Sequence, residues 1–255
     1  MHFSSENKPT QRISPYTQMA AYYDKIMIHV NYPRWAHYVE TIFRQQKFDF
    51  NEKLLDIGCG TGKFLAEMEK LEYNGDGCEP SQTMRAIAKN RLPKSTIYPC
   101  GLPQLSDIPV EEYSLMVCLY DTMNYLADET AFQQSLSSIY RKLKTPGIFI
   151  FDLVSEFHCK SYFKNYIDSE VLNENVAYSL ESQYDSAKKI QYTWVRVYTP
   201  EGVFEEKHCQ KIFDFDQVRE IIKTTDFELI NVYDEFSSDK ATARTGRGHF
   251  VLKKV

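Results

Sequence analysis

Three glycines at alternate positions, Gly58, Gly60 and Gly62, lie between an apolar run and an amphipathic segment. Because glycine lacks a Cβ, such residues let the chain turn sharply and let a ligand lie close to the backbone. If the amphipathic segment is a helix, its first N–H groups have no partner within it and can face that ligand. Glu79 ends the next apolar run and can accept hydrogen bonds from both hydroxyls of a ribose. The pattern therefore predicts a site for an adenosine-bearing ligand.

The spacing of these glycines argues against two common nucleotide sites. A dinucleotide fingerprint that begins at Gly58 needs a glycine where this chain has Lys63, so NAD is disfavoured. A phosphate-binding P-loop needs glycine at the position of Ile57 and Ser or Thr at that of Phe64, so ATP bound in this way is excluded.

Apolar runs and helical patterns alternate on both sides of the glycine loop. We predict strands at 53–57, 74–79, 96–100, 115–120 and 148–153, helices at 63–71, 82–90 and 128–142, and two helices before them between residues 16 and 46. A helix at 216–224 and strands at 229–233 and 249–253 complete the core. This order predicts an α/β fold: a Rossmann-like sheet of seven mostly parallel strands with helices on both faces.

A different pattern follows Asp152, where apolar residues recur with period two. We expect a small antiparallel insertion of three strands, at about 176–180, 190–198 and 203–213, with a turn at 199–202. The predicted organisation is N-terminal helices and the first part of the core at 1–154, the inserted strands at 155–213, and the rest of the core at 214–255.

Composition narrows the class of partner. The formal net charge is −5, and no basic run is long enough to suggest nucleic acid or anionic lipid. No stretch reaches the roughly 18 apolar residues of a membrane span. The six cysteines form no C-x-x-C pair, which favours a cytoplasmic protein, and the six histidines lack metal-ligand spacing, so we expect no bound metal. A small-molecule partner is therefore expected, and a homodimer is left open.

The glycine loop, with Asp56 two residues ahead of it, resembles motif I of class I methyltransferases. The likeness extends over nearly the whole chain to the small-molecule methyltransferases that include sugar N,N-dimethyltransferases. It rests on Tyr16-x-x-Met19-Ala20, Tyr22-Tyr23-Asp24, Tyr32-Pro33-Arg34-Trp35, the segment Tyr120 to Leu126, and Glu206-x-His208-x-x-Lys211. The resemblance implies S-adenosylmethionine (S-adenosyl-L-methionine) as cofactor, with the loop holding its amino-acid end.

The same resemblance assigns residues to the two ligands. Cofactor contacts are expected from Tyr23, Trp35, Asp56, Gly58, Cys59, Gly60, Gly62, Glu79, Pro80, Met84, Gly101, Leu102, Leu119 and Tyr120. Acceptor contacts are expected from Asn124, Tyr125, Trp194 and Glu206. Two features depart from the pattern: Glu79 replaces the commoner aspartate, and the segment Pro99 to Leu102 lacks the acidic residue that relatives use for the adenine amino group.

The sulfonium methyl is already activated, so the protein mainly has to orient the nucleophile and exclude water. A general base is needed only if the nucleophile arrives protonated, and the candidates are Asp121 and His208. Each has a structural alternative, since Asp121 can cap a turn with Asn124 and His208 can be a hydrogen-bonded strand residue. Tyr23 and Trp35 are either a lid over the cofactor or core of the N-terminal helices. Asp56 is expected behind the loop, and Arg244 and Arg247 in solvent.

The function expected from the sequence is methyl transfer from S-adenosylmethionine to a nitrogen or oxygen of a small molecule. Two alternatives stay open at this point: methylation of RNA or protein, and a non-catalytic module that binds S-adenosylmethionine.

Overall fold

Two strands of the core sheet, Leu54–Ile57 and Tyr113–Cys118, are buried along their whole length. In the computed structural model, which describes residues 9–47, 52–110 and 112–255, the strands of this sheet are β2 (Leu54–Ile57), β3 (Gly75–Cys78), β4 (Ile97–Tyr98), β5 (Tyr113–Cys118), β6 (Leu143–Val154), β11 (Glu228–Asp234) and β12 (Arg247–Lys254). Their order is β11-β12-β6-β5-β2-β3-β4, and only β12 runs against its neighbours. Within these residues the predicted seven-stranded Rossmann-like sheet is confirmed.

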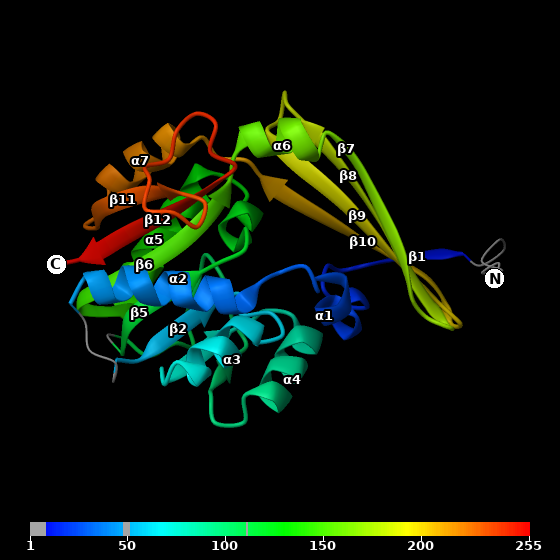
Figure 1. Cartoon of the computed structure of the whole chain (residues 1–255), viewed down its shortest axis with the longest axis horizontal. Helices are drawn as coiled ribbons and strands as arrows, with labels where there is room; N and C mark the ends of the chain where they lie inside the picture. Colours follow the sequence, from blue (N-terminus) through cyan, green and yellow to red (C-terminus); the bar gives the residue numbers. More distant parts are fainter. Residues whose placement is uncertain (1–8, 48–51, 111) are drawn as a thin grey trace.

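Helices cover both faces of the core sheet (Figure 1). One face packs against α2 (Tyr32–Gln45), α3 (Lys63–Lys70) and α4 (Gln82–Arg91), and the other against α5 (Glu129–Lys142) and α7 (Phe215–Lys223). Successive side chains of a strand point to opposite faces, so Leu54 joins the first group of helices and Leu55 the second.

A second sheet extends from one side of the core, and we call it the outer sheet (Figure 1). Its described strands lie in the order β1 (Thr10–Ile13), β10 (Gly202–Lys211), β9 (Ile190–Thr199), β8 (Val176–Asp185) and β7 (Asn165–Asn173). The prediction of three strands was wrong because both edge strands are largely exposed and show no period-two pattern. The helix α6 (Glu156–Tyr162), which the sequence did not predict, connects β6 to β7.

The segment before α2 also differs from expectation. Where a full helix was predicted, the chain forms the 3₁₀ turn η1 (Met19–Ala21) and one turn of helix, α1 (Tyr23–Ile26). Met19 and Ile26 pack against Val195 and Val197 of β9, and we call the face of the outer sheet that carries these valines its inner face. The segment is thus shaped by a distant sheet, whereas α2 forms as predicted, with Asn31 capping its first turn.

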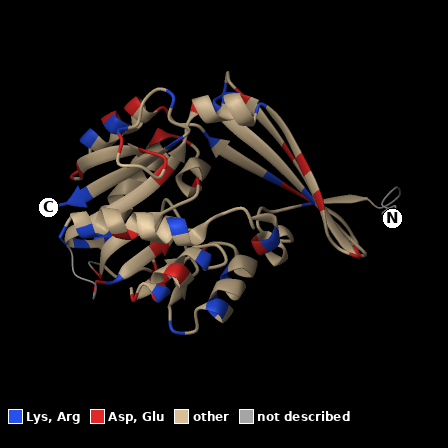
Figure 2. Ribbon diagram, in the orientation of Figure 1, with Lys and Arg blue, Asp and Glu red and all other residues tan. Residues whose placement is uncertain are grey.

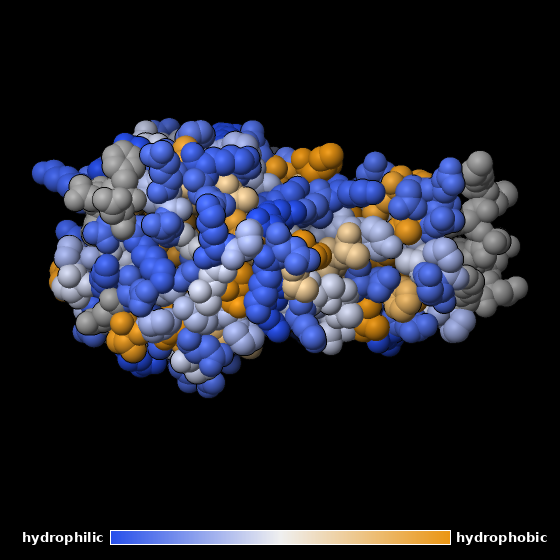
Figure 3. Space-filling view, turned by 90° about the horizontal axis from the view of Figure 1, so that it is seen from below, coloured by the Kyte–Doolittle hydropathy of each residue, from blue (hydrophilic) through white to orange (hydrophobic). Residues whose placement is uncertain are grey.

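The carboxyl ends of β2, β3, β5 and β6 lie at the same edge of the core sheet, and their loops meet η1, α1 and the outer sheet there. The 3₁₀ turn η2 (Thr122–Tyr125) follows β5 at this edge and contacts β10. Among the described helices, none is long and apolar enough to cross a membrane. On the face drawn in Figure 3, hydrophobic residues form small, separated patches. The predicted cytoplasmic location and homodimer stay predictions.

Candidate active site

The glycine loop turns between β2 and α3 with positive φ angles, 75° at Gly58 and 56° at Gly60. A Cβ at Gly58 would lie 2.6 Å from Cγ2 of Thr122, so only glycine lets η2 pack this closely on the loop. At Gly60 a Cβ would meet nothing within 4 Å among the described atoms. The backbone of Gly60 therefore faces open space, which is what a bound ligand needs.

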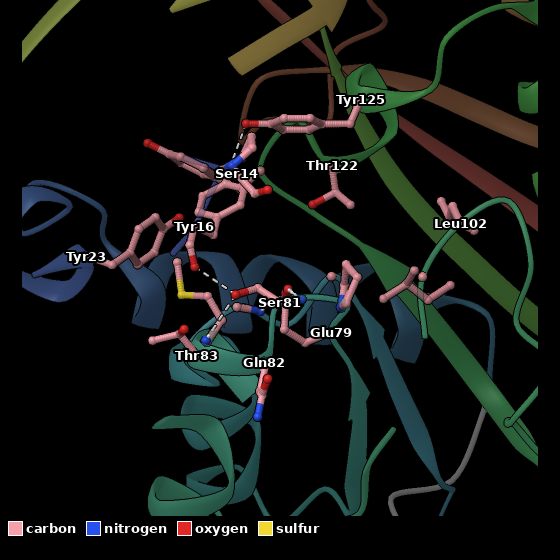
Figure 4. A pocket seen from close by; sticks show the side chains of 18 of the residues that line it. Ser14, Tyr16, Tyr23, Glu79, Ser81, Gln82, Thr83, Leu102, Thr122 and Tyr125 are labelled. Atoms are coloured by element: carbon pink, nitrogen blue, oxygen red, sulfur yellow. Dashed lines mark hydrogen bonds between the residues drawn. The ribbon is translucent and has the colours of Figure 1, made fainter. Parts of the chain in front are cut away.

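Glu79 lies directly after β3 and is held by backbone amides. Its Oε2 accepts a hydrogen bond from the N–H of Gly60 at 3.0 Å, and its Oε1 accepts one from the N–H of Ser81 at 2.7 Å. Burial raises the pKa of this carboxyl, while the two amides oppose the rise. Each oxygen keeps a second lone pair, so the carboxylate can accept two further hydrogen bonds. In Figure 4 its side chain lies beneath Tyr16, across the cavity from Tyr125.

The first cavity, of about 680 Å³, lies between the glycine loop, Glu79 and the segment before η1. Such a volume is typical of a site for a cofactor-sized ligand. Of the predicted cofactor residues, its lining includes Tyr23, Gly58, Gly60, Glu79, Pro80, Met84, Gly101, Leu102, Leu119 and Tyr120. It also includes residues that the sequence analysis missed: Ser14, Pro15, Tyr16, Thr17, Ser81, Thr83 and Thr122.

A second cavity, of about 360 Å³, lies against the inner face of the outer sheet. Four tyrosines, Tyr16, Tyr23, Tyr120 and Tyr125, line both cavities, so the two spaces meet at these rings. The predicted residues Asp121, Asn124 and His208 line the second cavity as well. The structure thus brings the candidate catalytic residues to the far side of the tyrosines from Glu79.

Asp121 belongs to a buried charge cluster. Its carboxylate forms an ion pair with Arg247, which also pairs with Asp152. The carboxylate of Asp152 accepts the N–H of Tyr120 at 2.6 Å and that of Asp121 at 3.1 Å. Burial raises the pKa of Asp121 to about 6, although the nearby Arg247 charge lowers it. The cluster thus holds two carboxylates and one guanidinium, and Asp121 and Arg247 line the second cavity.

The residues Tyr120 and Asp121 also have positive φ angles, 57° and 65°. Residues other than glycine adopt this conformation at a cost of roughly 1–3 kcal/mol, and the surrounding structure has to hold them in it. The carboxylate of Asp152 does so, because it binds both of their amide groups.

His208 is linked to the cavity wall through two tyrosines. The Tyr16 and Tyr125 hydroxyl oxygens lie 2.7 Å apart, and the Tyr125 hydroxyl lies 2.8 Å from Nδ1 of His208 (Figure 4 draws the two tyrosines). On its other side, Nε2 of His208 lies 3.6 Å from Oε2 of Glu206. Burial raises the pKa of Tyr16 and of Tyr125, so both hydroxyls stay protonated at neutral pH.

The Glu206 carboxylate is fully buried and tethers the chain around Tyr16. It accepts the backbone N–H groups of Tyr16 at 2.6 Å, Thr17 at 3.1 Å, Gln18 at 2.8 Å and Met19 at 2.8 Å. Burial alone would raise the pKa of Glu206, but the neighbouring His208 and the hydrogen bonds from these amides lower it overall. Glu206 is therefore a carboxylate that fixes Tyr16 between the two cavities.

Comparison with known proteins agrees with this geometry. Residues 54–147 match a family described as "Methyltransferase domain". A protein of Geobacillus sp. (strain WCH70), named as a candidate methyltransferase, is 26% identical over 249 residues, which are 94% of this chain and 99% of that protein.

Two solved structures share the fold. An S-adenosylmethionine-dependent methyltransferase from Clostridium acetobutylicum superposes with a TM-score of 0.79 at 22% identity, covering 93% of this chain and 98% of the other. CalS10 from Micromonospora echinaspora, an amino pentose methyltransferase solved with S-adenosylmethionine bound, has a TM-score of 0.69 at 21% identity over 93% of this chain and 96% of its own.

Residues 54–147 thus form a methyltransferase domain, and the chain has the fold of S-adenosylmethionine-dependent methyltransferases. The free lone pairs of Glu79 fit the ribose of S-adenosylmethionine, and the open backbone at Gly60 fits its amino-acid end.

A small space behind the glycine loop of the methyltransferase domain, of about 50 Å³, is lined by Trp35, Asp56 and Cys59. Burial, and then the charge of Glu79, raise the pKa of Asp56 to about 8. This matches the expectation that Asp56 lies behind the loop. Trp35, a residue of α2, packs edge-on against Phe236 and Tyr120, so its ring is part of the core.

Three further predicted site residues lie outside the lining of the two cavities, and Arg247 is not where it was expected. Gly62 lines neither cavity, because it packs on α4, where a Cβ would lie 2.8 Å from Cδ1 of Leu92. The Glu206 carboxylate binds backbone amides and is absent from the cavity lining. Trp194 lies on the opposite face of the outer sheet, beside Lys207. Arg247 was expected in solvent but is buried in the cluster with Asp121.

Asn124 lines the second cavity, yet both ends of its amide serve the backbone. Its Nδ2 donates to the carbonyl of Lys211 at 2.8 Å, and its Oδ1 accepts the N–H of Val154 at 3.1 Å. The side chain thereby joins η2 to the ends of β6 and β10, which positions Tyr125 at the cavity.

Proposed function

We propose that the protein transfers the methyl group of S-adenosylmethionine to a nitrogen or oxygen of a small molecule bound in the second cavity. The observation that carries this proposal is the meeting of the two cavities at Tyr16, Tyr23, Tyr120 and Tyr125. One cavity has the features of a cofactor site, and the other has the size of a small acceptor and shares these rings with the first.

An amine is the favoured nucleophile. Asp121 and Asp168 line the second cavity, and the single Arg247 there is already paired with two carboxylates. Aromatic rings and an excess of carboxylates attract a cationic ligand. The amino pentose methyltransferase CalS10, which shares the fold, is in line with this choice.

The cofactor supplies a methyl group that its sulfonium already activates. The chain's own residues then have to orient the acceptor, exclude water and take up one proton. Tyr16 and Tyr125 are placed for the first two tasks, and the Asp121 carboxylate for attracting the acceptor's positive charge.

The proton has a route through the hydrogen-bonded side chains. Its proposed path is from the acceptor to the Tyr16 oxygen, with the Tyr16 proton passing to Tyr125 and the Tyr125 proton to Nδ1 of His208. The resulting imidazolium lies beside the carboxylate of Glu206, which stabilises it. His208 and Asp121 thus have different roles, one as the end of the relay and the other as an electrostatic partner.

We also propose that residues 155–213 cover the acceptor, because the inner face of their sheet forms one wall of the second cavity. A nucleic-acid substrate is disfavoured. Figure 2 shows Lys and Arg interspersed with Asp and Glu over α2, α3 and α4, without a stripe of one sign.

Methyl transfer from cofactor labelled in its methyl group tests the proposal. The purified protein is incubated with a panel of small amines and alcohols, and in parallel with total RNA and with denatured protein. We expect label in the low-molecular-weight fraction, most strongly with amines. Label found only in RNA or protein would contradict a small acceptor.

A further inference from the structure

Polar side chains cross the inner face of the outer sheet in two rows. Ser182, Thr193 and His208 lie side by side on β8, β9 and β10, and all three line the second cavity. Gln191 and Gln210 face each other one step further along β9 and β10 and line it too. The inner face of the sheet therefore presents polar groups to the cavity in both rows.

Most of these polar groups already have partners. The hydroxyls of Ser182 and Thr193 lie 2.9 Å apart, and Nε2 of Gln210 donates to the carbonyl of Asp121 at 3.4 Å. His208 is bonded through Nδ1 to Tyr125, while its Nε2 has no hydrogen bond within the described part of the chain and lies 3.6 Å from the carboxylate of Glu206. Ser182, Thr193 and Gln210 therefore have partners, and Nε2 of His208 has a charged neighbour.

Gln191 is different. Its Nε2 donates to the carbonyls of Phe163 at 3.4 Å and of Tyr192 at 3.2 Å, which identifies the other end of the amide as the oxygen. That oxygen, Oε1, has no hydrogen-bond donor among the described residues, although the residue is only 5% exposed. A buried acceptor without a donor is unfavourable and is rare in folded proteins.

We propose that Oε1 of Gln191 is a recognition site for the acceptor molecule, taking a hydroxyl or N–H group at the end remote from the nucleophile. The inference rests on the proposed function, since it places the acceptor in the second cavity. Gln191 and Thr193 are two positions apart on β9, so the donor group lies roughly 7 Å from the part of the acceptor that faces Thr193 and His208. The acceptor is thus an amine that carries a hydrogen-bond donor at that distance.

The pair pentylamine and 5-amino-1-pentanol tests this site, because the two amines differ only in a terminal hydroxyl. Their dissociation constants are measured by calorimetry on protein saturated with S-adenosylhomocysteine. We expect the amino alcohol to bind about tenfold more tightly, the effect of one hydrogen bond that satisfies a buried acceptor.

Gln191→Met removes the oxygen and keeps the length of the side chain, so we expect it to abolish this preference and to leave pentylamine binding within about twofold. Tyr192→Phe is the matched control, since the neighbouring residue of β9 points to the opposite face, and it should retain the preference. The melting temperature and the affinity for S-adenosylhomocysteine of each variant report whether it is folded.

Three results would overturn the inference: no preference in the unmodified protein, including no binding of either amine; a preference that persists in Gln191→Met; or an equal loss of both amines in that variant. Failure of the proposed function looks different. In that case the preference is found and depends on Gln191, but no amine accepts label from S-adenosylmethionine.

Discussion

Two buried glutamates define the two halves of the site, and they use their carboxylates differently. Glu79 accepts two backbone amides, both from loops at the same edge of the core sheet, and each of its oxygens keeps a free lone pair. Glu206 accepts four amides from residues 16–19, nearly 190 positions away in the chain. The carboxylate of Glu79 can still accept hydrogen bonds from a ligand. The carboxylate of Glu206 instead joins β10 to the N-terminal segment that lines the cavities.

Because of this difference, we assign Glu79 mainly to ligand binding and Glu206 mainly to the folding of the site. A carboxylate with free lone pairs contributes mainly when its ligand arrives, whereas one saturated by amides contributes to folding whether or not a ligand is present. Substitutions at the two positions should therefore be distinguishable by whether they change stability or affinity.

The largest effect is expected at Glu206. Glu206→Gln replaces one carboxylate oxygen by an NH₂ group that faces amide N–H groups, so we expect the free energy of unfolding to fall by about 3 kcal/mol. Urea denaturation measures it. Turnover should also fall, because Tyr16 loses its anchor between the cavities.

The neighbouring Glu205→Gln is the control. Glu205 lies on the opposite face of the outer sheet and pairs there with Arg12 and Arg196, so its loss should cost at most about 1 kcal/mol. Equal losses in the two variants would contradict a special role for Glu206.

The next effect concerns Asp56, behind the glycine loop. Its pKa of about 8 in the folded protein exceeds the usual value of 3.8, so the folded state binds this proton more tightly than the unfolded state. Between about pH 4 and pH 8 the unfolded chain has released the proton and the folded chain has not, so this group makes stability fall as pH rises.

Asp56→Asn removes that contribution. We expect the free energy of unfolding of the variant, relative to that of the unmodified protein, to rise by on the order of 3 kcal/mol from pH 4 to pH 8. The pKa difference of Asp56 sets an upper limit of about 5 kcal/mol for this rise. Denaturation series at several pH values measure the gain. A constant difference across this range would show that Asp56 titrates normally.

At Glu79 the effect should appear in affinity. Glu79→Ala should weaken S-adenosylmethionine binding by about 1.5–3 kcal/mol, the value of hydrogen bonds to a charged acceptor. Calorimetric titration measures the change, and urea denaturation should show a much smaller loss of stability than in Glu206→Gln. An unchanged dissociation constant would place the ribose elsewhere.

The same contrast explains what the sequence could predict. The sequence predicted the glycine loop, Glu79 and the core strands. These features depend on residues close in the chain, or on the regular alternation of buried strands and helices, and both leave a recognisable pattern. The five-stranded outer sheet among the described residues could not be counted correctly, because β7 and β1 are exposed edge strands without an apolar period.

Long-range partners account for the residues that were misplaced or missed. Arg247 appeared solvated because only the fold brings it to Asp121 and Asp152. Tyr16 was read as helical, yet its backbone is held by Glu206 from the far end of the chain. Gln191 belongs to no sequence motif. Its proposed role follows from the missing hydrogen-bond partner of its Oε1 among the described residues, which only the structure reveals.

The smallest effect is expected at Trp194, which the sequence analysis assigned to the acceptor. Tyr192, Trp194 and Arg196 alternate along β9 and therefore share one face, but a period of two cannot say which face lines the cavity. The structure puts Trp194 on the outer face, with the Lys207 ammonium 5.4 Å from its ring centroid, while Thr193 and Val195 face inward.

Trp194→Leu should therefore leave both the Michaelis constant for an acceptor and the turnover number within about twofold of the unmodified protein. Its cost in stability should be near 1 kcal/mol, from the lost aromatic and cation–π contacts with Tyr192 and Lys207. Val195→Ala, one residue further along β9 on the inner face, is the opposite case and should raise the Michaelis constant. If Trp194→Leu raised it and Val195→Ala did not, the acceptor would bind on the outer face of the sheet, and the comparison between the two glutamates would no longer describe the two halves of one site.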